Sequence, residues 1–261
     1  MRTPWLTNVL FVAAAIGIWE AVCLMHIVPV LLLPSPLMVL DAFRETYPNI
    51  LFHAAATLTR ALAGFIAGTG LGIVLGLAMT WNTRFFAILD PIVESLRPVP
   101  AICAIPFVIL WFGIGNDGQI LLTTLSCAVV LAVEVFHAAR NVSPVIVRAA
   151  QSLGASKWTL YRSILFPAIL PTITPGLRVI GALSFSIAVA SEFIGAQWGL
   201  GFIIMRATRT LETQTILLGM LMIGILARST DLAIRGTMFR LTRWVESSTD
   251  LLQEARKDDH S

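Results

Sequence analysis

Apolar residues gather in six long stretches of the chain. A helix rises about 1.5 Å per residue and bilayer hydrocarbon is about 30 Å thick, so roughly 20 apolar residues cross it. We therefore predict six transmembrane helices, over residues 9–28, 61–81, 101–115, 120–136, 173–196 and 215–234. The third stretch is the shortest. The first lacks a clear small-residue cleavage site, which indicates a retained anchor rather than a signal peptide.

The composition also indicates an all-α polytopic membrane protein. Of the 261 residues, 57% are hydrophobic and only 13% are charged, whereas a soluble domain carries about 25% charged residues. The mean hydropathy is +0.83. These values argue against a disordered chain, a nucleic-acid-binding protein and a secreted disulfide scaffold. Cys23, Cys103 and Cys127 lie in apolar stretches, which is typical of packing residues rather than of disulfides or zinc ligands.

The distribution of Lys and Arg predicts the orientation, because these residues stay preferentially on the cytoplasmic side. With the N-terminus inside, the inner side holds all but four of the 18 Lys and Arg residues, including Arg178, Arg228 and Arg235. The four left outside are Arg44, Arg60, Arg206 and Arg209. Both termini are therefore expected in the cytoplasm. The net charge of +3 reflects this topology and does not indicate a nucleic-acid partner.

Glycines recur at every fourth residue of the second apolar stretch and so lie in one row down one helix face. The row consists of Gly64, Gly68, Gly72 and Gly76. Small residues let membrane helices approach closely, which matters because lipid tails give apolar helices little reason to associate. We expect this row to pack against another helix of the same chain. An interface with a second subunit is the alternative.

The fifth stretch carries a looser set of small residues, in which Ser184 and Ala188 are candidates for lining a translocation path. Four acidic residues also fall in apolar stretches, namely Glu20, Glu134, Glu192 and Asp231. A charge in lipid costs at least about 2.5 kcal/mol, so each should face protein or water. Glu192 lies near the outer end of its helix and is a candidate for shaping an external gate. The alternative is an acid bonded to neighbouring backbone.

Residues 138–172 form the longest polar segment on the inner side and predict two short helices. Ser143 is suited to an N-cap with Pro144 as the first helical residue, and Gly154 is suited to a left-handed C-cap. Ser156 can cap a second helix, which should end before Pro167. Helical spacing puts two sets of residues on opposite faces of the first helix, Val145, Ala149, Ala150 and Leu153 on one and Arg148, Gln151 and Ser152 on the other.

Two short helices bounded by such cap residues, Pro and Gly also occur in DNA-binding helix-turn-helix units. A pair held between two membrane helices is poorly placed to read DNA. It is better suited to passing force to a soluble partner.

The same segment resembles the EAA loop of type I binding-protein-dependent ABC importer permeases. The matching residues are Arg148-Ala149-Ala150, Gly154 and Ile164-Leu165-Phe166-Pro167. Arg148 stands where Glu is commonest in that family, and Phe166 where Leu is. By this resemblance, the residues that couple the chain to an ATPase subunit are Arg148, Ala149, Ala150, Gln151, Ser152, Gly154, Ala155, Ser156 and Pro167.

Further segments resemble the nitrate, taurine and sulfonate branch of these permeases. They are Leu33-Pro34-Ser35-Pro36, Leu89-Asp90-Pro91, Leu96-Arg97-Pro98-Val99-Pro100, Trp111-Phe112-Gly113-Ile114-Gly115 and Gly199-Leu200-Gly201. Together with the EAA-like loop, the similarity runs over residues 33–244. The branch implies a small oxyanion such as a sulfonate, taurine or nitrate as the transported solute.

The resemblance implies one permease domain over residues 1–261 in the bacterial inner membrane. Its type 1 membrane-spanning part would cover about 55–244, with a cytoplasmic coupling loop over about 138–172 between the fourth and fifth helices. It also implies a homodimer of permeases, two ATP-binding subunits and a periplasmic or lipid-anchored solute-binding protein. The chain has no G-x-x-x-x-G-K-[ST] loop. We therefore expect no catalytic residue, metal or cofactor here, and Mg-ATP in the partner subunit.

Two other classes of function compete with an importer subunit. The acids in apolar stretches are compatible with an ion-coupled secondary transporter, although no inverted repeat or broken helix is visible in the sequence. An intramembrane enzyme is the weakest alternative, because neither H-E-x-x-H nor G-x-S-x-G occurs.

Overall fold

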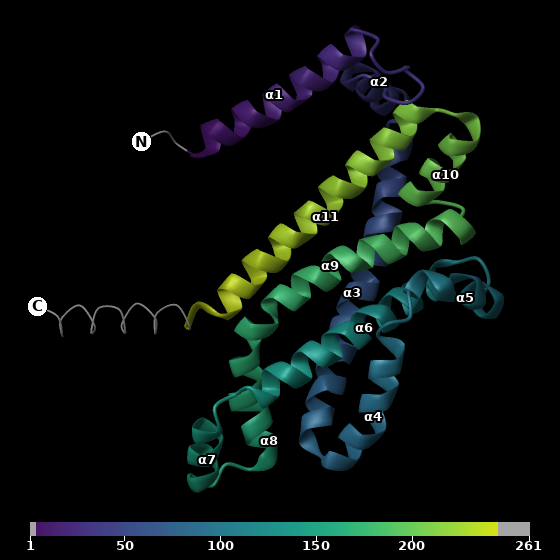
Figure 1. Ribbon diagram of the computed structural model, residues 1–261. Helices are drawn as coiled ribbons and strands as arrows, with labels where there is room; N and C mark the ends of the chain where they lie inside the picture. The colour runs from purple at the N-terminus through teal and green to yellow at the C-terminus, as the bar shows by residue number, and fades with distance from the viewer. Residues whose placement is uncertain (1–3, 245–261) are drawn as a thin grey trace, which may run out of the picture. The chain divides into compact units, whose positions relative to one another are not determined.

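The structure is a computed structural model that describes residues 4–244, and every regular element in that range is helical (Figure 1). This confirms the all-α prediction. The elements in order are α1 Pro4–Leu24, α2 Pro36–Thr46, α3 Asn49–Trp81, α4 Thr83–Leu96, the 3₁₀-helix η1 Ala101–Ala104, α5 Ile105–Phe112, α6 Asn116–Arg140, α7 Pro144–Ser152, α8 Lys157–Leu160, the π-helix η2 Tyr161–Leu165, α9 Phe166–Gly195, α10 Leu200–Thr210 and α11 Thr213–Leu241.

Four helices in the described part of the chain are long and apolar enough to cross a membrane. They are α3, α6, the continuous helix Lys157–Gly195 and α11. Three of them contain a predicted stretch completely, and Lys157–Gly195 contains all but the last residue of the stretch 173–196. A fifth span is formed if α4 and the segment Ala101–Phe112, which meet at 91°, cross the membrane together. The coarser prediction, a polytopic all-helical membrane protein, is therefore confirmed.

The third predicted stretch, residues 101–115, does not form one helix long enough to cross a membrane by itself. The segment begins with the 3₁₀ turn η1 and continues as the eight-residue helix α5, which is only about 12 Å long. Prolines break the segment on its N-terminal side, because Pro98 and Pro100 donate no backbone hydrogen bond. Gly113, at φ +72°, ends α5.

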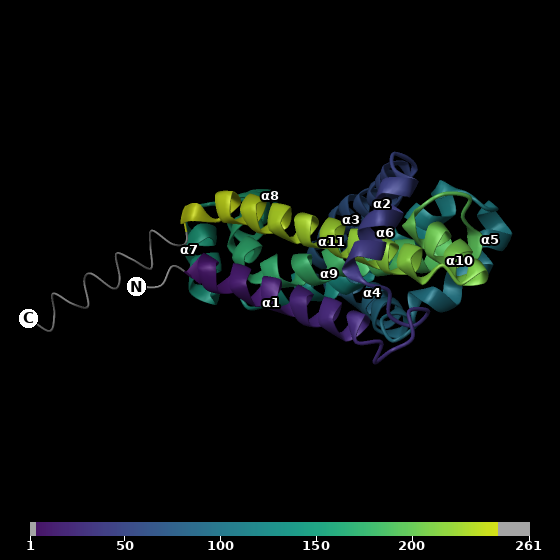
Figure 2. The ribbon, with the colours of Figure 1, turned by 90° about the horizontal axis from the view of Figure 1, so that it is seen from above.

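The first predicted span is also shorter than expected. α1 is one straight helix in both ribbon views (Figures 1 and 2), but it ends at Leu24. His26 then takes a left-handed conformation at φ 53°, which a helix cannot continue. The following loop turns back on the helix, since Trp19 Nε1 donates to the carbonyl of Pro34 at 3.1 Å. The apolar helical part covers Val9–Leu24.

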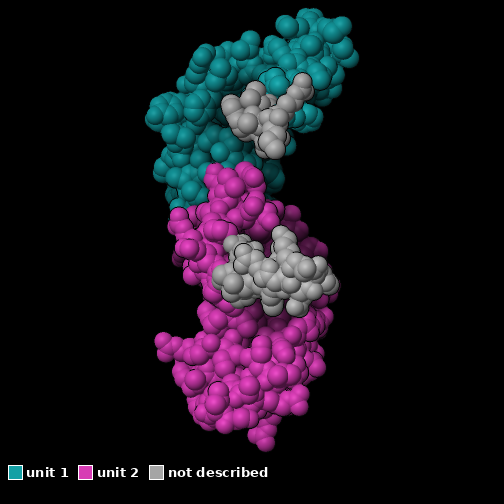
Figure 3. Space-filling view, turned by 90° about the vertical axis from the view of Figure 1, so that its left-hand side faces the viewer, with its two compact units in different colours: residues 1–59, 189–226 teal, residues 60–188, 227–261 magenta. Residues whose placement is uncertain are grey.

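The chain divides into two compact units that alternate along the sequence (Figure 3). Unit 1 comprises Met1–Thr59 and Val189–Leu226, and unit 2 comprises Arg60–Ala188 and Ala227–Ser261. The buried core of unit 1 consists of Val39, Ala42, Ile50, Ala54, Leu200, Ile203 and Leu218. The core of unit 2 lies where α6 and α9 pack, around Leu131, Val135, Ile169, Ile173 and Ile180.

Within unit 2, the glycine row of α3 faces α6. The four members are Gly64, Gly68, Gly72 and Gly76. A Cβ added to Gly68 would lie 2.6 Å from the Cβ of Cys127 and 2.7 Å from the carbonyl oxygen of Thr124, closer than real contacts allow. The row therefore serves intrachain packing, as the first of the two alternatives expects, and α6 fills the face that a second subunit would need.

Candidate functional site

The first helix of the cytoplasmic segment is α7, and its start follows the sequence only in part. Pro144 occupies the first turn as predicted, where a missing N–H costs nothing. The hydroxyl of Ser143 makes no capping hydrogen bond. Its carbonyl instead accepts hydrogen bonds from the N–H groups of Ile146 at 3.1 Å and Val147 at 3.4 Å. The start of α7 is therefore stabilised by backbone hydrogen bonds and not by a side-chain cap.

The end of α7 is a Schellman motif centred on Gly154. This residue has φ +81°, which confirms the predicted left-handed C-cap. The N–H of Gly154 donates to the carbonyl of Gln151 at 3.0 Å, and the N–H of Ala155 donates to that of Ala150 at 3.0 Å. These two bonds satisfy carbonyls that a helix end leaves free. The bend between α7 and α8 is therefore fixed by backbone hydrogen bonds.

Ser156 caps the second helix as predicted, since its hydroxyl oxygen accepts from the N–H of Thr159 at 3.1 Å. The prediction that this helix ends before Pro167 is wrong. α8 passes through the π-turn η2 into α9, and the N–H of Phe166 donates to the carbonyl of Tyr161 one residue further back than in an α-helix. The wider turn accommodates Pro167 in the first turn of α9, where no N–H is needed.

Aromatic and cationic contacts join α8 and η2 to the end of α3. Lys157 Nζ donates to the carbonyl of Trp81 at 2.7 Å and lies 4.9 Å from the centre of its ring. The rings of Trp81 and Tyr161 are 4.6 Å apart, and the hydroxyl of Tyr161 donates to Thr80 Oγ1 at 3.3 Å. This anchor cannot be recognised from the sequence, because its residues come from distant segments.

The two faces of α7 differ from the prediction. Of the four residues expected to share an apolar face, only Ala150 is buried; the side chains of Val145 and Leu153 are 69% and 88% exposed. The buried side is formed by Ala150 together with the partly buried Val147. Val145, Ile146 and Leu153 are exposed apolar residues, and we call them the α7 apolar patch.

The polar residues of α7 interact with their own helix. Arg148 Nε donates to the carbonyl of Pro144 at 3.3 Å, and the hydroxyl of Ser152 donates to the carbonyl of Arg148 at 3.0 Å. A cavity of about 620 Å³ lies alongside, lined by α7, α8 and the end of α6. Its cationic lining residues are Arg140, Arg148 and Lys157, and no acidic residue lines it.

Glu192 lies in unit 1, where it caps α10. The residue is 1% exposed, and its carboxylate accepts hydrogen bonds from the hydroxyl of Thr57 at 2.9 Å and from the N–H of Gly201 at 2.8 Å. The N–H of Leu200 donates to Thr57 Oγ1 at 2.8 Å, and that of Gly199 donates to Nδ1 of His53 at 3.0 Å. These partners satisfy the first N–H groups of a helix that has no N-cap side chain of its own.

The predicted path residues Ser184 and Ala188 are both fully buried. The hydroxyl of Ser184 donates to the carbonyl of Gly181 in its own helix at 2.8 Å. The exposed small residues of this part of α9 are instead Ala182 and Ser186.

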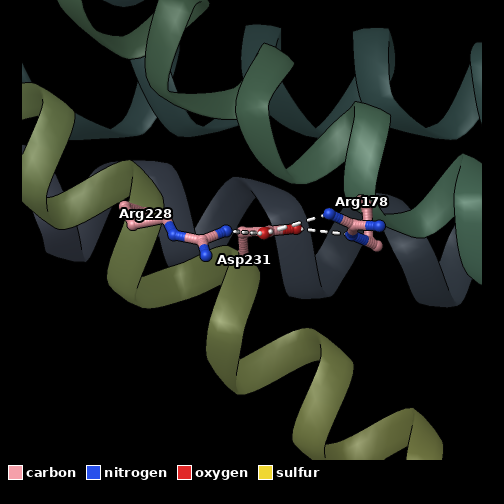
Figure 4. A network of polar contacts seen from close by, with 3 residues as sticks. All are labelled: Arg178, Arg228 and Asp231. Atoms are coloured by element: carbon pink, nitrogen blue, oxygen red, sulfur yellow. Dashed lines mark hydrogen bonds and ion pairs between the residues drawn. The ribbon is translucent and has the colours of Figure 1, made fainter. Parts of the chain in front are cut away.

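Sequence reasoning missed a charged network in unit 2 that joins α9 to α11 (Figure 4). Arg178 and Arg228, which the sequence assigns to the inner side of the membrane, lie in the long helices α9 and α11 and bond to the same carboxylate, that of Asp231. A signal was present, because opposite charges in two apolar stretches tend to pair. In the described part of the chain, no three His, Cys, Asp or Glu side chains are arranged to hold a metal ion.

The family described as "binding-protein-dependent transport system inner membrane component" matches residues 68–245, more than half of the chain. The chain belongs to this family. TauC, the taurine transport system permease protein of Escherichia coli strain K12, is 35% identical over 89% of this chain and 87% of its own. SsuC of Bacillus subtilis strain 168, named as a candidate aliphatic sulfonates transport permease, is 28% identical over 94% of this chain and 90% of its own.

Solved ABC importers have the same fold. A chain of the MetNI methionine ABC transporter in an inward-facing conformation is 20% identical, with a TM-score of 0.60 over 71% of this chain and 94% of that chain. A chain of a bacterial ABC transporter involved in the import of alginate is 16% identical, with a TM-score of 0.66 over 91% of this chain and 96% of that chain. At these identities the likeness establishes the fold alone.

This permease is thus a multi-pass protein of the bacterial inner membrane and the membrane component of a binding-protein-dependent ABC importer. Such an importer also contains ATPase subunits and a periplasmic binding protein. The permease subunits of this family lack ATPase activity and hold no cofactor. The expectations of an importer subunit and of ATP hydrolysis in a partner are confirmed by this membership.

Proposed function

We propose that this permease forms a homodimer, binds two ATP-binding subunits and imports a small sulfonate-type anion delivered by a periplasmic or lipid-anchored binding protein. TauC and SsuC support this solute class, because both align along most of this chain and are named for sulfonated compounds. Taurine carries a sulfonate group, and nitrate is likewise a compact oxyanion.

The proposed topology has six spans in one permease domain over residues 1–261. α1 is the first span, and the bent pair α4 and α5 is the third. The other four are α3, α6, the continuous helix Lys157–Gly195 and α11. Both termini and the coupling loop, residues 138–172, lie in the cytoplasm, in agreement with the positive-inside rule. The membrane-spanning part covers about residues 55–244.

The α7 apolar patch is the observation that carries the coupling proposal. Leu153, at 88% exposed, is the C-cap residue of α7, and the Schellman bonds of Gly154 fix this end of the helix. Exposed apolar side chains on a rigid element mark protein interaction sites. A groove on the ATPase would receive this patch. Because α8, η2 and α9 form one helix from Lys157 to Gly195, displacement of the docked elbow passes directly into a membrane span.

Gly154→Asp tests the coupling role. We expect the variant to reach the membrane but to lose uptake and the ATPase partner, because the new side chain distorts the capped bend and adds charge beside the patch. The left-handed backbone costs a non-glycine residue about 1–2 kcal/mol. Gly113→Asp is the control, since Gly113 also has a positive φ, +72°, and open surroundings, and its ψ of −174° makes the substitution there the more strained of the two.

Co-purification of the ATPase from detergent is the measurement. The Gly113→Asp variant should retain the ATPase and the Gly154→Asp variant should not. Full ATPase binding and normal uptake by Gly154→Asp would refute the docking site.

The solute class is tested in proteoliposomes that contain the permease, its ATPase and its binding protein. Radiolabelled taurine should accumulate only with ATP inside the compartment that holds the ATPase. Accumulation driven by an ion gradient, without the ATPase, would instead identify a secondary transporter.

A further inference from the structure

The network of Arg178, Arg228 and Asp231 is the most unusual charged cluster in the membrane-spanning helices of unit 2. Arg178 binds Asp231 with both arms of its guanidinium, Nε to Oδ1 at 2.6 Å and Nη2 to Oδ2 at 3.1 Å. Arg228 Nη1 donates to the same Oδ2 at 2.8 Å. Figure 4 shows the carboxylate lying between the two guanidinium groups.

Both helices extend well beyond the network in each direction. Arg178 is about 18 Å along the axis from Phe166, the first residue of α9, and Asp231 is about 15 Å from Leu241, the last residue of α11. From the outer helix ends, Arg178 is about 26 Å from Gly195 and Asp231 is about 27 Å from Thr213, close to the thickness of bilayer hydrocarbon. The network therefore lies toward the cytoplasmic end of the two spans. Charges in this position avoid hydrocarbon and face either water or protein.

The guanidinium groups are too exposed for a buried structural pair. The side chains of Arg178 and Arg228 are 42% and 61% exposed, and that of Asp231 is 21% exposed. Lipid is a poor environment for these groups, so in the proposed homodimer they face either water or the partner subunit. The surplus of positive charge around Asp231 favours water and an anion over a second protein surface.

Positive charge is in excess at this place. Two arginines share one carboxylate, and Arg235 lies one helical turn beyond Asp231 on the same side of α11. Glu134 of α6 packs on Gly176 of α9, on a different side of that helix from Arg178. A surplus of guanidinium groups attracts anions, and the planar fork of Arg matches the oxygens of a sulfonate or carboxylate.

A row of small residues continues from the network along α9. Arg178, Ala182 and Ser186 follow one another at every fourth residue, and all three are exposed. The hydroxyl of Ser186 donates to the carbonyl of Ala182 at 3.3 Å, so it stays close to its own helix. This face therefore leaves room beside α9.

We propose that Arg178 and Arg228 bind the oxyanion group of the solute as it passes along this face of α9. Asp231 holds Arg178 in place when no solute is bound. The solute's sulfonate then takes over one or both guanidinium hydrogen bonds of Asp231, and releases them again as it leaves. No covalent step is involved. The inference rests on the proposed import of a sulfonate-type anion and adds the residues that recognise it at the cytoplasmic end of the spans.

The first test uses Arg228→Gln and Arg178→Lys in the complete reconstituted importer. Arg228→Gln keeps the two-armed Arg178–Asp231 pair and removes one cation, whereas Arg178→Lys keeps the charge and loses the fork. We expect each to lower the rate of taurine uptake about tenfold or more, because a hydrogen bond to a charged group is lost. Arg240→Gln, near the end of α11, is the matched control and should transport normally.

ATP hydrolysis stimulated by the loaded binding protein separates this inference from the proposed function. Stimulated hydrolysis with slow uptake in the two variants supports solute binding by Arg178 and Arg228. Normal uptake in both variants overturns this role of the arginines but leaves the proposed import of a sulfonate unaffected. If the wild-type complex shows no ATP-driven uptake of a sulfonate, the proposed function itself fails.

The second test measures whether the position of Arg228 is accessible to water. Arg228→Cys is made with Cys103→Ser, because Cys103 is the exposed native thiol and Cys23 and Cys127 are buried. A thiosulfonate reagent with a sulfonate group should modify Arg228→Cys faster than one with a trimethylammonium group, and taurine should slow the reaction. Ala233→Cys, exposed on another side of α11, is the control and should react slowly. Equal, slow reaction at both positions would place Arg228 against lipid or protein and overturn the proposal.

Discussion

At the scale of single residues, Glu192 shows how a carboxylate inside a membrane protein is satisfied. Its oxygens receive the hydroxyl of Thr57 and the N–H of Gly201, and Thr57 in turn receives the N–H of Leu200. Both of the alternatives drawn from the sequence keep Glu192 near the loop around Gly199. The contacts favour a structural cap for α10 over a mobile gate.

Thr57→Val tests the cap. Valine has nearly the shape of threonine but cannot bridge Glu192 and Leu200, so two buried polar groups lose a partner. We expect a loss of about 1–3 kcal/mol of stability, visible as a lower melting temperature in detergent. Thr59→Val is the matched control, because the exposed hydroxyl of Thr59 bonds only to the carbonyl of Ala55 in its own helix. Equal melting temperatures of the two variants would argue against the cap.

Residue patterns predicted the helix caps of the coupling loop better than they predicted which side chains of the loop are buried. Gly154 and Ser156 act where propensity places them, because a left-handed C-cap and an N-cap depend on nearby backbone. Which side of α7 is buried depends on Tyr161, Leu165 and other distant residues of the core, so helical spacing alone chose the wrong face. The pairing of Arg178 with Asp231 is likewise invisible until α9 and α11 are placed together.

At the scale of elements, the spans follow from length and apolar content where the helix is uninterrupted. The four stretches in α3, α6, α9 and α11 were predicted for this reason. The third stretch does not form a span by itself, because prolines on either side of η1 interrupt the helix. A count of apolar residues cannot predict the resulting bend of 91°. The prediction of a helix end before Pro167 was wrong for the opposite reason. The π-turn η2 accommodates the proline, and the helix continues.

The contact between α3 and α6 makes a prediction about two neighbouring glycines. Gly68→Ala should destabilise the protein by about 1–3 kcal/mol, because the new methyl group would overlap Cys127 and Thr124. Gly70→Ala should be neutral or stabilising by up to about 1 kcal/mol, since nothing lies within 4 Å of its Cβ position and alanine favours the helix. Thermal unfolding in detergent measures both variants. Destabilisation of the same size at both positions would contradict this packing.

At the scale of the whole molecule, family membership and the fold assign the chain to an ABC importer, whereas its partners and solute are proposals. The EAA-like segment was recognisable from Ala149, Ala150, Gly154 and Pro167 even though Arg148 replaces the usual acid. The structure adds a mechanical reason for the segment, because the elbow formed by α7 and α8 is rigid and continues without a break into a span. A rigid lever of this kind can carry the motion of an ATPase into the membrane.

Crosslinking from Leu153 tests this central claim most directly. Leu153→Cys, made with Cys103→Ser, places a thiol at the most exposed apolar position of α7; Ala150→Cys, only 8% exposed in the parent chain, is the buried control. In the assembled complex we expect a short crosslinker to join Leu153→Cys to the ATPase subunit, with a yield that changes between the ATP-bound and nucleotide-free states, and Ala150→Cys to give little product. Absence of any crosslink from Leu153→Cys to a nucleotide-hydrolysing subunit, in a complex that still imports its solute, would contradict the account.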